Sequence, residues 1–133
     1  MRTITCAIAL SLSFGVASVA AADFDGSKVM ICAPTTTLIC GAIGTCVRGE
    51  AGDVNLDHFI EIDVANKSAR GITSGRISPI GHVARDGGQL VLHGAQNSRG
   101  WSATISESSG EMTIAVAAEK LSFTVFGACM ATE

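Results

Sequence analysis

The stretch "GWSATISESSGEMTIAVAA", residues 100–118, decides the fold because its apolar side chains recur at every second position. In its first half Trp101, Ala103 and Ile105 fall on one face, and serine or threonine occupies the positions between them. After the turn-forming run "SESSG" the same alternation returns over residues 112–116. A period of two is typical of half-buried antiparallel strands, whereas an amphipathic helix would repeat its apolar residues with a period near 3.6.

The same pattern extends through the rest of the chain after residue 22. The segments between the expected strands are rich in the glycine, asparagine, aspartate and serine that tight turns require. In residues 55–64 one apolar row is formed at the even positions, so we expect this whole segment to be a strand; the row comprises Leu56, Ile60, Ile62 and Val64. A single helical turn over residues 35–39 is the one alternative to extended structure. The other expected strands are "KVMICA", "ARGIT", "RISPIGHVAR", "QLVLHG" and "LSFTVFGAC".

Short consecutive strands joined by tight turns predict an all-β fold, an antiparallel meander of about eight strands. Such a meander either closes into a small up-and-down barrel or remains a strongly curled sheet with two exposed edges. Pro79 lies inside an expected strand and removes a backbone donor, so that strand is expected to be bent, bulged or at an edge.

Residues 1–22, "MRTITCAIALSLSFGVASVAAA", have the layout of a cleavable secretory signal peptide. Arg2 gives a basic start, an apolar run follows, and small alanines precede Asp23. The apolar run is shorter than the roughly 20 residues that span a bilayer, so a retained membrane anchor is the alternative and no span is expected after cleavage. Residues 23–133 then form a single all-β domain, which is periplasmic or secreted.

The charge of the chain argues against nucleic acid as a partner. The sequence has 9 basic and 12 acidic residues, and loss of Arg2 with the signal peptide changes the formal net charge from −3 to −4. The remaining basic residues are scattered, so the surface repels phosphate backbones. One tryptophan and no tyrosine leave little aromatic surface on which bases could stack.

Four cysteines remain after cleavage, Cys32, Cys40, Cys46 and Cys129, and an exported chain favours pairing them in two disulfides. The seven, five and 82 residues between them lack the paired C-x2-C pattern of zinc sites. No C-x-x-C motif is present for thiol exchange. Metal binding and redox chemistry are the alternatives to structural disulfides.

The favoured pairing follows from closure of the sheet. If "KVMICA" and "FTVFGAC" are the first and last strands, closure brings Cys32 to Cys129 and leaves Cys40 for Cys46. In the chain-entropy model the long bridge contributes about 4.7 kcal/mol and the local one about 2.4 kcal/mol. The alternative pairing is Cys46 with Cys129 and Cys32 with Cys40.

Two histidines are weak candidates for a metal site. If Asp86 and Gly87 form a two-residue hairpin turn, His82 and His93 lie diagonally on the outer face, within side-chain reach. Two imidazoles hold a divalent metal only weakly, and a third ligand is not evident. We therefore expect a solvated surface pair, with no metal and no other cofactor. The third histidine, His58, interrupts an apolar row and is expected to be partly buried at the edge of the core.

Asp57, Glu61 and Asp63 share one face of an expected strand. Alternate strand positions are about 7 Å apart, and such a row is more often the hydrated face of a sheet than a calcium site or a catalytic pair. The segment "GITSG" at residues 71–75 has Ser74 one place too late for a G-x-S-x-G nucleophile elbow. No catalytic residue is predicted.

Several segments together resemble short uncharacterised exported proteins of Gram-negative proteobacteria, over nearly the whole mature chain. They are the cysteine cluster and "FDGSKVMIC", "VNLDHFIEID", "GQLVLHG", "RGWSATI" and "FTVFGAC". The resemblance implies a periplasmic location and transfers no activity, cofactor or catalytic residue. In architecture the chain is also similar to small periplasmic lysozyme-inhibitor barrels, but "SGRI" at residues 74–77 lacks the tyrosine of their Ser-Gly-x-x-Tyr loop.

The leading hypothesis is a non-enzymatic binding or envelope-accessory protein whose partner is an unidentified protein or small ligand. The alternatives are a hydrolase or metal-dependent enzyme that uses His82 and His93, and a lysozyme-inhibitor-like protein. An apolar barrel interior with an open mouth would favour binding of a lipid or another small ligand.

Overall fold

The computed structural model describes residues 23–133, and the signal peptide expected over residues 1–22 lies outside the described part. One antiparallel sheet of nine strands accounts for the fold, together with a single 3-10 turn, η1 (Ala51–Val54). The strands are β1 (Met30–Gly41), β2 (Cys46–Gly49), β3 (Ile60–Asp63), β4 (Ser68–Gly71), β5 (Ile77–Asp86), β6 (Gln89–Gln96), β7 (Arg99–Ser106), β8 (Glu111–Ala117) and β9 (Leu121–Ala131).

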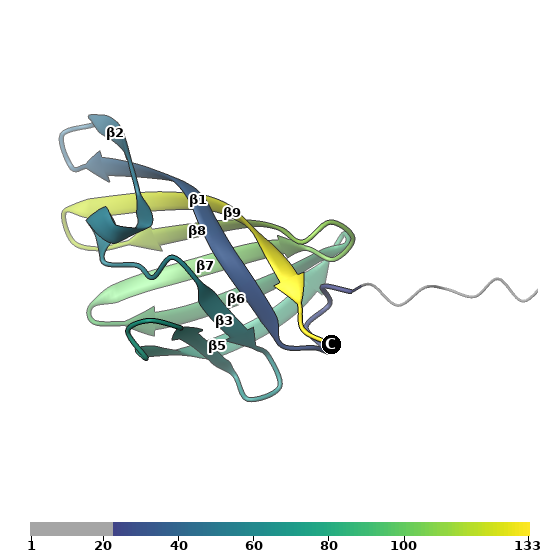
Figure 1. Cartoon of the computed structure of the whole chain (residues 1–133). Coiled ribbons are helices and arrows are strands. Elements are labelled where there is room, and N and C mark those ends of the chain that lie inside the picture. Colours follow the sequence, from purple (N-terminus) through teal and green to yellow (C-terminus); the bar gives the residue numbers. More distant parts are fainter. Residues whose placement is uncertain (1–22) are drawn as a thin grey trace, which may run out of the picture.

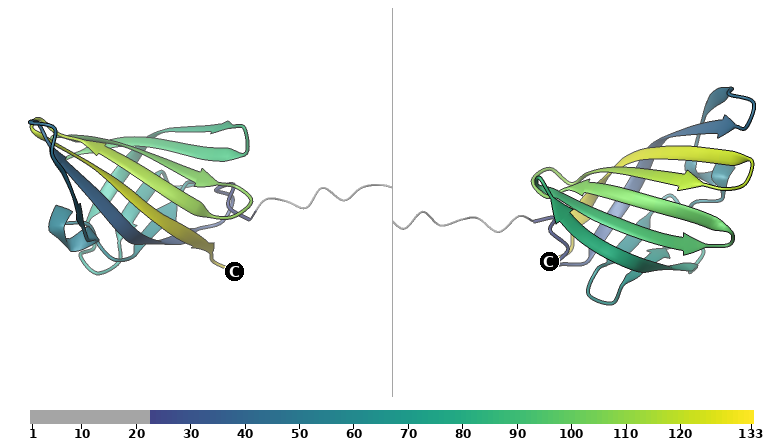
Figure 2. Two further views of the ribbon diagram at one scale, coloured as in Figure 1. Left: turned by 90° about the horizontal axis from the view of Figure 1, so that it is seen from above. Right: turned by 180° about the vertical axis from the view of Figure 1, so that it is seen from behind.

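The sheet closes because the first and last strands pair along their whole length, from Met30 opposite Ala131 to Gly41 opposite Leu121. Eight strands, β1 and β3 to β9, form the closed barrel, and β2 is an additional strand beside β1. Figure 1 shows β1 and β9 side by side, and Figure 2 shows from behind how the later strands form one curved wall. The predicted all-β up-and-down barrel is confirmed.

β1 is 12 residues long and has two partners on its second edge. Its first residues pair with β3, from Met30 to Cys32, and a later part pairs with β2, from Thr37 to Cys40. The hairpin of β1 and β2 extends beyond the barrel wall (Figure 1). Residues 35–39 are therefore extended, and the alternative of a helical turn there is wrong.

Both prolines of the chain lie beside an irregularity in the ladder. The register of β1 against β9 shifts between Pro34 and Thr36, and that of β5 against β6 shifts between Ile80 and His82, just after Pro79. Proline lacks the amide hydrogen that a regular ladder needs, so a bulge accommodates it and bends the strand. The expectation that Pro79 lies in a bulged strand is confirmed.

The strand expected over residues 55–64 is only partly present, because β3 begins at Ile60. Val54 ends the 3-10 turn, and Asn55 has a left-handed backbone, with φ of 58°, which stops extended structure from starting there. His58 consequently lies in a connecting segment and is exposed, so the expectation of a partly buried core-edge histidine is wrong.

The two disulfides join register partners on neighbouring strands. Cys32 of β1 is bonded to Cys129 of β9 across the closing seam, and Cys40 is bonded to Cys46 within the β1–β2 hairpin. This is the favoured of the two pairings. The first bridge is buried in the barrel, and it therefore fixes the two ends of the meander to each other.

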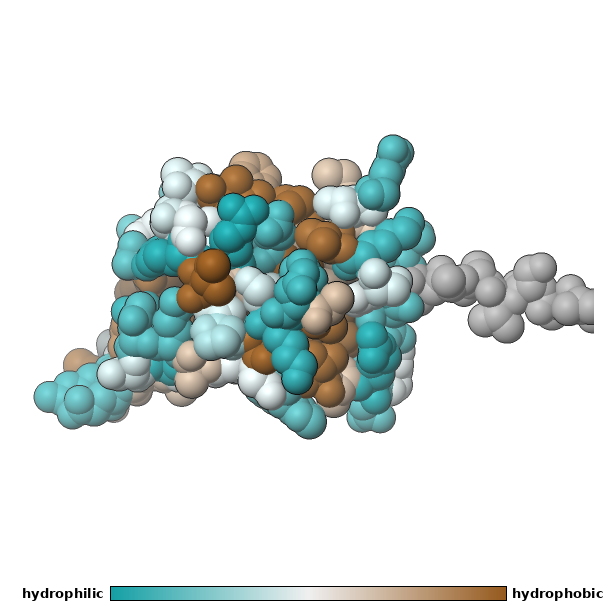
Figure 3. Space-filling view, turned by 90° about the horizontal axis from the view of Figure 1, so that it is seen from below, coloured by the Kyte–Doolittle hydropathy of each residue, from teal (hydrophilic) through white to brown (hydrophobic). Residues whose placement is uncertain are grey.

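Several large apolar side chains are exposed on the outer surface of the barrel. The most exposed large ones are Ile43 at the tip of the β1–β2 hairpin, 90% exposed, and Met130 near the end of β9, 70% exposed. On the face seen from below, apolar areas are separated by hydrophilic ones (Figure 3). Isolated exposed apolar residues are normal on a globular protein.

Candidate functional site

One half of the barrel interior is filled by side chains. Alternation along each strand directs these residues inward, as the period of two predicts, and they leave little or no surface to solvent. They comprise Met30, Cys32, Leu90, Leu92, Ile105, Met112, Val125 and Cys129. This packing makes that half of the barrel a conventional hydrophobic core.

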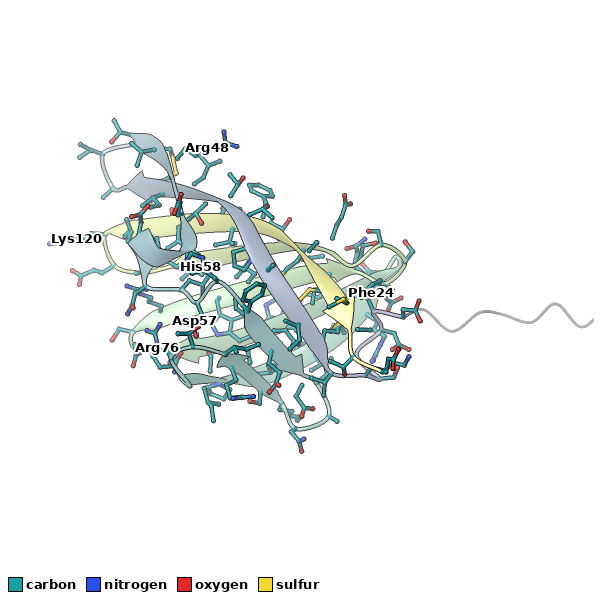
Figure 4. All side chains as sticks on the ribbon, viewed as in Figure 1. Phe24, Arg48, Asp57, His58, Arg76 and Lys120 are labelled. Carbon is teal, nitrogen blue, oxygen red and sulfur yellow. A yellow bond between two sulfur atoms is a disulfide. The ribbon has the colours of Figure 1, made fainter. Side chains whose placement is uncertain are left out.

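The N-terminal residues cover the same end of the barrel. The backbone amide of Phe24 donates a hydrogen bond to the carbonyl of Glu107, at 3.3 Å, and its ring lies against Gly110. Gly26 lies against Val64 and Leu90. Figure 4 shows Phe24 at the opposite end of the barrel from Asp57 and Arg76. The two ends therefore differ, since the N-terminal segment covers one of them.

The other half of the interior is a cavity of about 300 Å³. Its deeper wall is apolar, and polar side chains from three connections form its rim. The apolar wall includes Ile60, Ile62, Ala69, Ala103, Ile114 and Val116. A concave apolar space of this size with a few polar groups at its mouth has the general character of a small-molecule site.

The cavity exists because several inward positions around it carry small side chains. Ala69 and Gly71 are the inward residues of β4, paired with Ile62 and Ile60 of β3. Ala103 is the inward residue between Trp101 and the core on β7, and it is 1% exposed. Larger side chains at these positions would fill the space, as leucine and isoleucine do in the packed half.

Trp101 forms one wall of the cavity and is held in place from two sides. Its indole lies over Gly94, the residue opposite it on β6, where a Cβ atom would overlap the ring. Its Nε1 donates a hydrogen bond to Oγ of Ser78 on β5, at 2.8 Å. The ring thus spans β6, and its one polar atom is satisfied while its apolar face lines the cavity.

Asp57 and Ser74 join two connections at the rim. Oδ2 of Asp57 accepts hydrogen bonds from the backbone amide and the hydroxyl of Ser74, each at 2.9 Å. The amide of Ser74 contributes most to holding the pKa of Asp57 below its ordinary value of 3.8. Gly71 leaves room for this contact, since an added Cβ would lie 2.6 Å from Cγ of Asp57.

Arg76 strengthens the same side of the rim. Its Nη2 lies 3.8 Å from Oδ1 of Asp57 and donates to the carbonyl oxygen of Asn55, while its Nε donates to Oγ of Ser74. Figure 4 shows Asp57 and Arg76 together at this end of the barrel. The positive charge of Arg76 is therefore balanced by a carboxylate at short range.

Arg99 reaches the cavity from the first residue of β7. Its guanidinium carbon lies 5.8 Å from the centre of the Phe123 ring, and its Nη1 donates a long hydrogen bond of 3.3 Å to the carbonyl of Val54. Both of these partners also line the cavity. Arg99 is half-buried, so a cationic group lies at the boundary between the apolar wall and the mouth.

His82 and His93 are direct cross-strand partners on the outer face, with ring centroids 5.9 Å apart. They are closer than the diagonal placement expected, because the turn is formed by Gly87 and Gly88 and not by Asp86 and Gly87. Within residues 23–133 no group of three histidine, cysteine or carboxylate side chains is placed to hold a metal ion. The pair also lies outside the barrel, away from the cavity.

The three carboxylates expected on one sheet face have separate local roles. Asp57 precedes β3 and belongs to the rim, whereas Glu61 accepts from Arg70 on β4 at 2.9 Å. Asp63 accepts from the backbone and side-chain amides of Asn66, and these bonds lower its pKa. The three groups do not converge on one site.

Sequence reasoning placed Trp101 and Ala103 on the inward face, but it did not identify the cavity or Arg99. Arg99 has the same parity as Trp101, so the alternation already directed it inward. The run "AQNSR", residues 95–99, has the composition of a turn, so Arg99 was assigned to a turn. In the structure Arg99 is the first residue of β7.

No protein-family model matches the chain, and no significant match was found among curated proteins or solved structures. In residues 23–133 there is no helix with the length and apolarity needed to cross a membrane. The fold and the cavity therefore define the class of protein: a disulfide-bonded antiparallel β-barrel with a partly hollow interior.

Proposed function

We propose that this protein is an exported, non-enzymatic binding protein that holds one small, largely apolar molecule inside its barrel. The observation that carries the proposal is the cavity of about 300 Å³, with apolar walls and a polar rim, in the half of the barrel that side chains leave unfilled. Apolar cavities without polar partners for water stay dry and accept apolar guests.

The volume of the cavity bounds the size of the ligand. An apolar cavity of about 150 Å³ holds benzene, so one of twice that volume accommodates about a dozen non-hydrogen atoms. At about 0.5 kcal/mol per atom, such a ligand would bind with a Kd of the order of tens of micromolar. Compounds with a single ring system or a chain of about ten carbons are in this range.

Trp101 provides a direct test, because it is the one tryptophan of the chain and lines the cavity. Titration with 1-decanol should change the tryptophan emission saturably, with one molecule bound per chain by calorimetry. Ala103→Leu should fill the cavity and weaken this binding at least tenfold. Ala115→Leu, the same change at an exposed position on β8, is the matched control and should bind like the wild type.

A titration without saturation up to the solubility limit of the alcohol would refute the proposal. Equal weakening by Ala103→Leu and Ala115→Leu would also count against it, since only the first of these residues lines the cavity.

The proposal includes export to an oxidising compartment. Two disulfides fit such a compartment, and the basic, apolar and small-residue regions of residues 1–22 match a cleavable leader. Mass spectrometry of protein isolated from the periplasm should give a chain that starts at Asp23 and lacks four hydrogens relative to the reduced form. The same spectrum under native conditions would reveal a retained ligand.

A further inference from the structure

The charge at the cavity mouth is unbalanced. Among residues 23–133, Arg70, Arg76 and Arg85 each have a carboxylate within ion-pair distance, and Arg99 does not. A guanidinium carries five N–H donors, and Arg99 uses one of them in its long bond to Val54. The remaining donors of this half-buried side chain are free to meet a ligand at the boundary of the apolar wall.

The acidic residue that lines the cavity is already occupied. Of the residues that line the cavity within the described chain, Asp57 is the one acidic residue. It is bound to the amide and hydroxyl of Ser74 and lies 3.8 Å from Arg76, so it balances that arginine. One uncompensated positive charge therefore remains at the mouth, and it belongs to Arg99.

A cation beside an apolar cavity selects for an anion. Burying a charge without a partner is costly, and a ligand that supplies the partner recovers this cost on binding. A planar guanidinium pairs with a carboxylate through two parallel, charge-assisted hydrogen bonds. The Phe123 ring lies against the guanidinium, with 5.8 Å between the ring centre and Cζ, and this contact limits how the side chain is oriented.

We propose that the ligand is an amphipathic carboxylate whose anionic head binds Arg99 and whose apolar tail occupies the hollow half of the barrel. This inference rests on the proposed function and specifies its ligand class. A chain of about ten carbons with one carboxylate meets both the volume of the cavity and its single uncompensated charge. Decanoate is the probe of this class, and 1-decanol is its uncharged counterpart.

The test compares the two probes by calorimetry and by Trp101 fluorescence at pH 7.5, where decanoate is ionised. Arg99→Gln should weaken decanoate binding about tenfold or more and change 1-decanol binding by less than about twofold, as expected for loss of a charge-assisted hydrogen bond. Arg99→Lys should restore part of the decanoate affinity. Arg48→Gln, at an exposed arginine on β2 outside the barrel, is the matched control and should leave both affinities unchanged.

The possible failures are distinguishable. If neither probe binds the wild-type protein, the proposed function fails and this inference fails with it. If both bind and Arg99→Gln weakens both equally or neither, the cavity binds ligands but Arg99 does not select the anion. If Arg48→Gln weakens decanoate as much as Arg99→Gln does, the attraction is a general surface charge effect and the inference is overturned. Thermal unfolding of each variant shows that the comparison is made on folded protein.

Discussion

The indole of Trp101 occupies the space that Gly94 leaves open on the neighbouring strand. One residue without a side chain thus allows a large ring to cross β6 and to bond Ser78 on β5 at 2.8 Å. This arrangement joins three strands at the mouth and forms a wall of the cavity. The contact between Trp101 and Gly94 therefore links the stability of the barrel to the shape of its interior.

Gly94→Ala should destabilise the protein and disturb the cavity. The added methyl group would overlap the indole of Trp101 and the carbonyl of Pro79, and overpacking of this kind costs about 1 to 3 kcal/mol. Urea unfolding should show the loss of stability, and the emission spectrum of Trp101 should shift. Gly100→Ala is the matched control, because an added Cβ at Gly100 meets nothing within 4 Å. A Gly94 variant as stable as the Gly100 variant would contradict this account.

The two disulfides should contribute unequally to stability. The Cys32–Cys129 bridge closes 97 residues of separation and is buried, whereas Cys40–Cys46 closes 6 and lies in an exposed hairpin. In the chain-entropy model these loops are worth about 4.7 and about 2.4 kcal/mol. Replacing the first pair by alanine should therefore lower the midpoint of thermal unfolding more than replacing the second. Equal midpoints of thermal unfolding for the two double variants would show that the bridge across the β1–β9 seam contributes no more to stability than the local bridge does.

Much of the fold could be predicted from the sequence, because the positions of apolar residues determine which side of a strand is buried. Alternation along the strands directs Val83 and Leu92 towards the core, and they face each other across β5 and β6. The register between these strands differs by two positions from the expected one, since Asp86-Gly87 and Gly87-Gly88 are both suitable turn sequences. A shift of two positions leaves every side chain on the same face of its strand. The inward and outward residues of β5 and β6 were therefore predicted correctly although the register was not.

The cavity could not be predicted in the same way. Alternation assigns Trp101 and Ala103 to the interior, but it does not say whether the summed side-chain volumes fill the enclosed space. The rim depends on contacts between residues far apart in the chain, such as Asp57 with Ser74. Residues 55–59, between the 3-10 turn and β3, also belong to a segment whose apolar spacing resembles that of a strand. Tertiary contacts override local pattern at these positions.

Thr37→Val should stabilise the protein. Thr37 is fully buried, opposite Val125 on the β1–β9 seam, and within residues 23–133 its hydroxyl has no hydrogen-bond partner. A buried hydroxyl without a partner costs about 1 kcal/mol or more, and valine has the same shape without it. The free energy of unfolding should rise by about 1 kcal/mol. Thr35→Val is the control, since the exposed hydroxyl of Thr35 bonds the carbonyl of Phe126 and its removal should give no gain.

Acid should weaken the rim through Asp57. Its pKa is lowered below 3.8 in the folded protein, so its carboxylate stabilises the fold above that pH, and this contribution is lost as pH falls through the folded pKa. Asp57→Asn should lower the urea midpoint at pH 7 and reduce the further fall between neutral pH and about pH 2. Asp25 and Asp63 also have lowered pKa values, so some acid sensitivity should persist in the variant.

Ser74→Ala distinguishes the two groups that bind Asp57. The backbone amide of Ser74 contributes more to the lowered pKa than its hydroxyl does, and alanine retains the amide. The alanine variant should therefore keep most of the acid sensitivity that Asp57→Asn removes. If Ser74→Ala abolishes the acid sensitivity as completely as Asp57→Asn does, the hydroxyl of Ser74, and not its backbone amide, is the donor that stabilises the carboxylate of Asp57. The measurement is the fall in the urea midpoint between pH 7 and about pH 2, compared between the wild type, Ser74→Ala and Asp57→Asn.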